Sequence, residues 1–324
     1  MFHKSKKSLG QNFLKSQMVV KKIIEAGEIT PDDIILEIGP GKGILTEKLL
    51  EKSKTVIAVE KDNQLFDFLK EKFSEQILNK KLILINEDIL KFDYLGALPL
   101  NDSLETFPKG LTLKKSQRSD LGERSNFDCK LGYKIIANIP YNITGAIFQK
   151  FLTAENQPTS IVLMVQHEIA KRILDKKESL LSLSVKAYGE PKIIMKVPAR
   201  FFSPAPKVNS AIISIKNISR NFFKDPEVRP LELLQGLTSG LTFEKKFWQI
   251  VRAGFAHKRK KLSGNLREKF LLKGLTLKKS QKSDLLIKIP QLTLPEIFQK
   301  EKIPLNSRAE NLNIDQWKKL VKYF

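Results

Sequence analysis

A series of short, continuously apolar segments limits the possible folds of this 324-residue chain more strongly than any other part of its sequence. The segments lie at residues 33–39, 54–60, 81–86, 133–138 and 160–166. Apolar runs without alternation are typical of parallel strands that are buried on both faces. The segment between the second and third runs has helical period and places Leu65, Phe66, Leu69 and Phe73 on one face. Alternating strands and helices predict a doubly wound α/β sheet.

The pattern changes in the second half of the chain. Residues 191–198 and 210–216 are apolar and separated by a single loop, which predicts an antiparallel pair at one edge of the sheet. After Asn217 the segments are helical and interrupted by Gly and Pro. We therefore predict an α/β domain at 1–217 and a smaller, all-helical domain at 218–324.

A polar stretch at about 96–132 separates two of the predicted strands, and we interpret it as an inserted surface segment. It contains the sequence KGLTLKKSQRSDL at 109–121, which recurs at 273–285 with one Lys/Arg exchange. Two distant copies do not make a solenoid, which needs adjacent repeats. No physical reason for the repeat follows from its residues.

Basic residues are concentrated toward the C-terminal end. The chain has 57 Lys and Arg against 35 Asp and Glu, and between Lys245 and Lys282 thirteen basic residues accompany a single acid, Glu268. Such a localised excess favours a nucleic-acid backbone as partner over an acidic membrane surface. One Cys and three His make a zinc site of the Cys/His type very unfavourable, and we expect no metal. There is neither an apolar stretch of membrane-spanning length nor a secretory signal, so we expect a cytoplasmic protein.

Three glycines, Gly39, Gly41 and Gly43, follow the first predicted strand. Glycine permits left-handed torsions and a close approach by a ligand. Glu60 ends the second strand 21 residues after Gly39, where a carboxylate can accept hydrogen bonds from both hydroxyls of a ribose. NAD and S-adenosylmethionine would both satisfy this arrangement. Asp88 ends the third strand, where it could contact the amino group of an adenine or simply cap a turn or helix.

The string ANIPYNIT (137–144) ends the fourth strand with an amide, a proline and an aromatic ring. Asn and Pro together mark turns, so a turn is one interpretation. The other is a pocket for a flat ring with an amino group on its edge.

Six motifs in one order distinguish these interpretations: QNFL (11–14), EIGPGKG (37–43), VEKD (59–62), ED (87–88), NIPYNIT (138–144) and FSPAPKVNSA (202–211). Together they closely resemble the ribosomal RNA adenine dimethyltransferases, and most of all the small-subunit type. Residues 254–266 and 307–317 are similar to the C-terminal helical region of that family. The resemblance implies a Rossmann-like class I S-adenosylmethionine-dependent methyltransferase fold. It also implies dimethylation of two adjacent adenosines in a hairpin loop near the 3′ end of small-subunit (16S) rRNA, by a monomer acting on a small ribosomal subunit precursor.

The resemblance further implies roles for the residues that match these motifs. The residues implied in cofactor binding are Asn12, Leu14, Gly39, Gly41, Glu60, Asp88 and Asn138. Within this set, Glu60 would hold the ribose, Asp88 would contact the adenine, and Asn138 would lie where the cofactor and the target base meet. The residues expected to bind RNA are Lys258, Arg259, Lys260 and Lys261.

Chemistry supplies a reason for the NIPY string in such an enzyme. An adenine amine is a poor nucleophile, because its lone pair is delocalised into the ring. The Asn138 side-chain oxygen and the Ile139 carbonyl can accept its two N–H bonds and stabilise the charge that develops. Pro140 stiffens the turn, and Tyr141 and Phe202 can stack on the base. Positioning and charge stabilisation are expected to supply most of the rate.

Three other functions are compatible with parts of the sequence. A large-subunit rRNA adenine methyltransferase of the antibiotic-resistance type would keep the chemistry and change the substrate. A nucleic-acid-binding relative without transfer activity would keep the fold. An NAD oxidoreductase would use the glycines and Glu60, but it would leave the basic C-terminal region unexplained.

Overall fold

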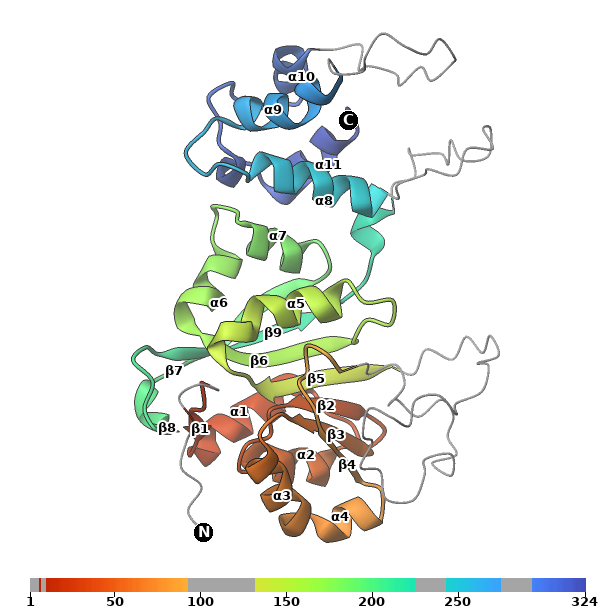
Figure 1. Ribbon diagram of the computed structural model, residues 1–324, viewed down its shortest axis with the longest axis vertical. Helices are drawn as coiled ribbons and strands as arrows, with labels where there is room; N and C mark the ends of the chain where they lie inside the picture. Colours follow the sequence, from red (N-terminus) through yellow and green to blue (C-terminus); the bar gives the residue numbers. More distant parts are fainter. Residues whose placement is uncertain (1–5, 7–9, 93–131, 225–242, 275–292) are drawn as a thin grey trace, which may run out of the picture. The chain divides into compact units, whose positions relative to one another are not determined.

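The computed structural model describes residues 6, 10–92, 132–224, 243–274 and 293–324, drawn as coloured ribbons in Figure 1. Most of the predicted insertion at 96–132, with the first copy of the repeat, lies outside the described residues. Of the second copy, only residues 273–274 are described. Within the described part of the chain, no helix is both long and apolar enough to cross a membrane.

A seven-stranded sheet has the strand order β4-β3-β2-β5-β6-β9-β7. Its strands are β2 (Ile34–Ile38), β3 (Thr55–Glu60), β4 (Leu82–Asn86), β5 (Tyr133–Asn138), β6 (Ser160–Gln166), β7 (Glu190–Val197) and β9 (Ser210–Lys216). The five strands from β4 to β6 in this order are parallel to one another, whereas β9 runs antiparallel to both β6 and β7. The predicted parallel sheet with an antiparallel pair at one edge is confirmed.

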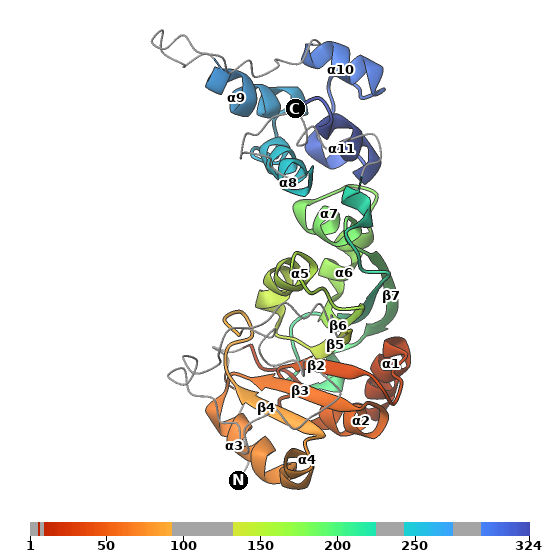
Figure 2. The same cartoon turned by 90° about the vertical axis from the view of Figure 1, so that its right-hand side faces the viewer.

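Helices cover both faces of this sheet, which explains why its strands are apolar throughout. They are α1 (Gln17–Gly27), α2 (Ile44–Lys52), α3 (Asn63–Lys72), α4 (Ser74–Leu78), α5 (Thr144–Leu152) and α6 (His167–Leu174). Figure 2 shows α5 on one side of the sheet and α1 and α2 on the other. The predicted apolar face of α3 is buried, since Leu65, Phe66 and Leu69 are at most 8% exposed. The doubly wound architecture is therefore confirmed.

The chain forms two compact units. The first comprises the chain up to Lys171 together with residues 189–218, and the second comprises residues 172–188 and the chain from Ser219 onward. The predicted boundary after Asn217 lies one residue from the last of the three changes of unit, between Ile218 and Ser219. Residues 172–188 belong to the second unit although they precede residues 189–218 of the first. A single boundary along the sequence, as predicted, does not describe this division.

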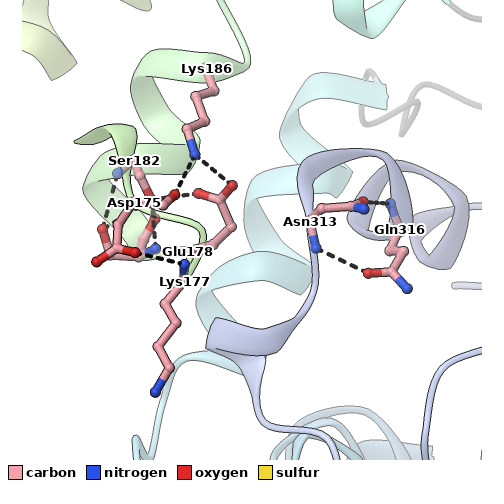
Figure 3. Close-up of polar contacts among 8 residues, drawn as sticks. Asp175, Lys177, Glu178, Ser182, Lys186, Asn313 and Gln316 are labelled. Atoms are coloured by element: carbon pink, nitrogen blue, oxygen red, sulfur yellow. Dashed lines mark hydrogen bonds and ion pairs between the residues drawn. The ribbon is translucent and has the colours of Figure 1, made fainter. Parts of the chain in front are cut away.

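Helices make up the second unit, as expected for the C-terminal region. They are α7 (Leu180–Lys186), α8 (Phe243–Gly254), α9 (Leu262–Gly274), α10 (Leu294–Lys300) and α11 (Ile314–Val321). Figure 3 shows how polar contacts organise residues 172–188: the buried Glu178 accepts hydrogen bonds from Ser182 Oγ and Lys186 Nζ, both at 2.7 Å. The Glu178 backbone N–H donates to the Glu310 carbonyl at 2.9 Å. The bond to Glu310 attaches the segment to the C-terminal part of its unit.

The order of the strands determines where a ligand can bind to the first unit. Strand β2 has β3 on one side and β5 on the other, so the connections diverge at its carboxyl end. In open α/β sheets such a point leaves a crevice beyond the strand ends, where ligands bind. The glycine loop 39–43, Asp88 and the segment 139–143 all follow strands at this edge.

Candidate active site

A cavity of about 230 Å³ lies at this edge of the sheet. Ten of the residues singled out in the sequence line it: Asn12, Leu14, Gly39, Gly41, Glu60, Asp88, Asn138, Ile139, Pro140 and Tyr141. They come from five separate segments of the chain. The fold thus brings together nearly all the residues that the sequence motifs had marked.

The glycine loop has left-handed backbone torsions at all three glycines, with φ of +65° at Gly39, +60° at Gly41 and +77° at Gly43. A Cβ at Gly43 would lie 2.6 Å from the Phe73 ring, so a side chain there would disturb the packing of α2 and α3. A Cβ at Gly39 would meet nothing within 4 Å. The loop therefore presents open space on the cavity side at Gly39.

Glu60 is held by two backbone N–H groups. Its Oε2 accepts from Gly41 N at 3.1 Å and its Oε1 accepts from Asp62 N at 2.9 Å. Burial raises the pKa of Glu60 above its ordinary value, while these two hydrogen bonds act in the opposite direction. The side chain is 6% exposed and borders the cavity. Its carboxylate is thereby fixed in direction before any ligand binds.

Asp88 lies farther along the same edge. Its Oδ2 accepts from Lys61 Nζ at 2.9 Å, and its Oδ1 accepts from Leu90 N at 3.0 Å. Burial opposes ionisation of Asp88, but the contacts with Lys61 and Leu90 outweigh it and lower the pKa of the carboxyl. Asp88 is therefore a charged acceptor at the end of the cavity, partly neutralised by Lys61.

Asn138 is the last residue of β5, and its amide is oriented by the N-terminal segment. Its Nδ2 donates to the Asn12 carbonyl at 3.4 Å. Among the described residues, no donor reaches its Oδ1. Because the amide nitrogen is directed to Asn12, the oxygen is left as an acceptor for a group outside the protein.

Tyr141 begins the short 3₁₀ helix that follows. Its hydroxyl shares a hydrogen bond of 2.7 Å with Ser210 Oγ, and its carbonyl accepts from Thr144 Oγ1 at 3.0 Å. Burial raises the pKa of the Tyr141 hydroxyl, so the phenol is neutral at physiological pH. The hydrogen bond to Ser210 fixes the direction of the ring, which borders the cavity.

Phe202 does not lie where the sequence interpretation placed it. It is 2% exposed, belongs to the apolar core, and is absent from the lining of the cavity. In the small sheet of β1 (Phe13–Leu14) and β8 (Phe202–Ser203), Leu14 pairs with Phe202. The structure therefore supports a packing role for Phe202, which joins the FSPAPKV motif to the QNFL motif, and does not support stacking on a base.

Glu37 is a buried acid in the cavity wall to which the sequence interpretation gave no role. It is 1% exposed, and among the described residues its Oε2 and the Thr46 hydroxyl have no hydrogen-bond partner. Burial raises the pKa of Glu37 to about 8. The charge of Glu60 raises the pKa of Glu37 further. The nearby Thr46 hydroxyl lowers it, although the two side chains do not form a hydrogen bond of standard geometry. One sequence signal could have identified Glu37: it is an acid near the end of an otherwise apolar strand, just before the glycine turn.

Replacing Glu37 with Gln is expected to weaken the pH dependence of stability. In the unfolded chain the carboxyl ionises from about pH 4.5, whereas in the folded chain it keeps its proton up to about pH 8. The contribution of Glu37 to the free energy of unfolding is therefore complete below pH 4.5. It is lost as pH rises toward 8, by at most about 1.4 kcal/mol per pH unit. Urea unfolding of the wild type and Glu37→Gln between pH 4.5 and 8.5 measures the difference. The exposed Glu75→Gln is the control, and its free energy of unfolding should change with pH in parallel with that of the wild type. A parallel curve for Glu37→Gln would contradict the prediction.

The basic residues predicted to contact RNA lie in the second unit. Lys258, Arg259, Lys260 and Lys261 are all exposed in the connection between α8 and α9. Asn265, which is 2% exposed, donates from Nδ2 to the carbonyls of Gly254 at 2.6 Å and His257 at 3.1 Å. A Cβ at Gly254 would collide with the Trp317 ring. The basic connection is therefore anchored at its start.

The described residues contain no group of three or more His, Cys, Asp or Glu side chains that could hold a metal ion. The polar residues that line the cavity carry carboxylates, side-chain amides, two lysine ammonium groups and a tyrosine hydroxyl. These groups suit hydrogen bonding to an organic ligand.

Comparisons with known proteins find similar sequences along nearly the whole chain. Ribosomal RNA small subunit methyltransferase A from Dehalococcoides mccartyi is 35% identical over 98% of this chain and 87% of its own length. The protein of the same name from Fusobacterium nucleatum is 33% identical over 100% of this chain and 99% of its own.

Two solved structures resemble the whole chain. A dimethyladenosine transferase from Plasmodium falciparum has a TM-score of 0.64 and 25% identity, covering 95% of each chain. The 23S rRNA methyltransferase ErmE has a TM-score of 0.61 and 22% identity, covering 96% of this chain and 99% of its own, and shares the fold. The predicted Rossmann-like class I methyltransferase fold is confirmed. The model of the family described as ribosomal RNA adenine dimethylase matches residues 2–324, and the chain belongs to this family.

Proposed function

We propose that the protein transfers methyl groups from S-adenosylmethionine to the N6 amines of two adjacent adenosines, in a hairpin loop near the 3′ end of small-subunit rRNA. The observation that carries the proposal is the orientation of Asn138. Its amide nitrogen donates to the Asn12 carbonyl, and Asn138 lines the same cavity as Glu60 and the glycine loop. Its oxygen is thereby left as an acceptor for an amine, in a cavity that also holds a carboxylate suited to a ribose.

The cavity fits S-adenosylmethionine on several grounds. The backbone at Gly39 leaves open space for a ligand, and the Glu60 carboxylate is fixed for two ribose hydroxyls. The orphaned Oε2 of Glu37, a residue that lines the cavity, would gain a partner from a polar ligand. Asp88 would contact the adenine amino group, and Asn12 and Leu14 would contribute to the wall of the cofactor site. When bound, S-adenosylmethionine supplies an electrophilic methyl group.

The protein's own residues would prepare the target amine. Asn138 Oδ1 and the Ile139 carbonyl would accept its two N–H bonds, which favours a pyramidal nitrogen and stabilises its developing positive charge. Pro140 restricts the turn that carries these acceptors. Tyr141, held by Ser210, would stack on the base with a contribution of about 1–3 kcal/mol. No residue needs to act as a strong base in this scheme.

The second unit would bind the RNA backbone. Lys258, Arg259, Lys260 and Lys261 present positive charge on an anchored connection, which suits phosphate contacts that are independent of sequence. We infer that a monomer acts in the cytoplasm on a precursor of the small ribosomal subunit. The names of the similar proteins support the small subunit over the large-subunit alternative.

The experiment is labelled methyl transfer to purified, unmodified small and large subunits in separate reactions, followed by nucleoside analysis. We expect incorporation into small subunits only, recovered as N6,N6-dimethyladenosine. Incorporation only into large subunits would favour the antibiotic-resistance type. Binding of S-adenosylmethionine without transfer to either RNA would favour the non-catalytic relative.

A further inference from the structure

Asp62 lies at the centre of a set of contacts between the N-terminal segment and the candidate cofactor site. Its Oδ1 accepts from Lys6 Nζ at 2.8 Å, and its Oδ2 accepts from Gln11 Nε2 at 2.9 Å. Gln11 Oε1 in turn accepts from the Lys6 backbone N–H at 2.8 Å. Asp62 is 2% exposed, whereas the Lys6 side chain is 41% exposed, so the carboxylate end of these bonds is shielded from water and the Lys6 end is not.

The backbone of Asp62 contacts the same site from another direction. Its N–H is one of the two donors that hold Glu60, the other being Gly41 N–H. The Asp62 carboxylate also accepts from Gln64 N at 3.0 Å and so caps the start of α3. One residue therefore fixes the direction of Glu60, the start of a helix and the position of Gln11.

Gln11 connects this set of contacts to the target side of the cavity. Its neighbour Asn12 supplies the carbonyl that accepts from Asn138 Nδ2. Residues 10–14 line the cavity, whereas Asp62 does not. Because Asp62 holds Gln11, it also limits the movement of the carbonyl that orients Asn138. The influence of Asp62 on the site is therefore indirect.

Asp62 carries its charge in this environment. Burial opposes ionisation, but the hydrogen bonds from Lys6 and Gln11 outweigh it and lower the pKa of the Asp62 carboxyl. Hydrogen bonds to a charged acceptor are stronger than those between neutral groups. A neutral side chain of the same shape would hold Gln11 less well.

We propose that Asp62 is a positioning residue for methyl transfer, which binds Lys6 and fixes Gln11 at the cavity so that residues 10–14, Glu60 and Asn138 keep one arrangement. This inference rests on the proposed function, since it takes the cavity to be the site of S-adenosylmethionine. It adds a residue outside the cavity on which both cofactor affinity and the orientation of the Asn138 amide depend.

Asp62→Asn tests the contact with Gln11 while preserving the helix cap, because Asn and Asp are equally good N-cap residues. The introduced NH₂ group would face Gln11 Nε2, placing two donors together. Rotating the Gln11 amide by half a turn would only move the conflict to the Lys6 backbone N–H. We expect the Kd for S-adenosylmethionine to rise about 10-fold and kcat to fall by a similar factor, with the melting temperature nearly unchanged.

A second variant exchanges donor and acceptor between the two positions. In Gln11→Glu combined with Asp62→Asn, the introduced carboxylate can accept from both the introduced amide and the Lys6 N–H, and the net charge equals that of the wild type. We expect the double variant to recover cofactor affinity and turnover to within about threefold of the wild type. Gln11→Glu alone places two carboxylates together and is expected to weaken binding.

Isothermal titration with S-adenosylmethionine and steady-state transfer to small subunits provide the readouts, with the exposed Asp67→Asn on α3 as the matched control. Wild-type affinity and turnover in Asp62→Asn would overturn the inference. A double variant no better than the weaker single variant would also overturn it, since the effect would not pass through Gln11. If the wild type itself neither bound the cofactor nor transferred methyl groups, the proposed function would fail first and this inference with it.

Discussion

Asn138→Ala is expected to lower the rate of methyl transfer by about 100- to 1,000-fold. The substitution removes the only side-chain acceptor that β5 presents to the target amine, and with it the contact between β5 and the Asn12 carbonyl. Asn138 is partly exposed and its one described hydrogen bond is long, at 3.4 Å, so little folding energy depends on it. RNA affinity is expected to stay nearly unchanged, because the basic residues lie in the other unit.

Single-turnover transfer with saturating cofactor and RNA measures this effect without a contribution from product release. Asn79→Ala is the matched control, since Asn79 is an exposed asparagine that precedes β4 at the opposite edge of the sheet. It should transfer at the wild-type rate. Wild-type turnover in Asn138→Ala would remove Asn138 from the mechanism and leave the orientation of its amide without a function.

The strands of the fold could be predicted almost residue by residue. All seven predicted segments are strands of the central sheet, and β5, β6 and β9 have the predicted bounds. The reason is physical: a strand buried on both faces must be apolar at every position, which leaves an unambiguous pattern. Residues 172–188 gave no such pattern, because they contact the second unit through residues that are distant in the sequence, such as the Glu178 N–H with the Glu310 carbonyl and the Tyr188 hydroxyl with Trp248.

The site could be predicted where the residues at strand ends carry the chemistry. Glu60, Asp88 and Asn138 each follow or end a strand, and the parallel order of the strands brings their ends to one edge. Asp62 was not identified, because it acts through residues that are close only in the folded chain. Gln11 is 51 positions away from it, and no local pattern marks such a pair.

Phe202 shows the limit of a prediction from motifs. An aromatic residue in a motif suggests stacking, but whether the ring faces a ligand or the core depends on the pairing of its strand. Here β8 pairs with β1, and Phe202 packs among Leu14 and other buried residues. Short two-residue strands such as these have no sequence period, so neither the pairing nor the burial of the ring could be derived beforehand.

Replacing Lys258, Arg259, Lys260 and Lys261 together with Ala is expected to weaken small-subunit RNA binding by about 10- to 100-fold at physiological salt. Each lysine or arginine that neutralises a phosphate releases counterions, so the slope of log affinity against log salt should become shallower by about 0.7–0.9 per lost contact. Lys260 donates to Glu268 Oε2 at 3.1 Å, and this pairing reduces its share. We therefore expect a total change of about 2 to 3 in the slope.

A matched control separates this local effect from the overall charge of the protein. Lys21, Lys22, Lys52 and Lys70 are exposed lysines of the first unit, and replacing them with Ala removes the same charge. If long-range attraction dominated, both variants would lose affinity and slope alike. If the anchored connection between α8 and α9 contacts phosphates, only the first variant should show the shallower slope. An unchanged slope in that variant would mean that these four residues face away from the RNA, and that the positive charge of the chain acts on binding from elsewhere.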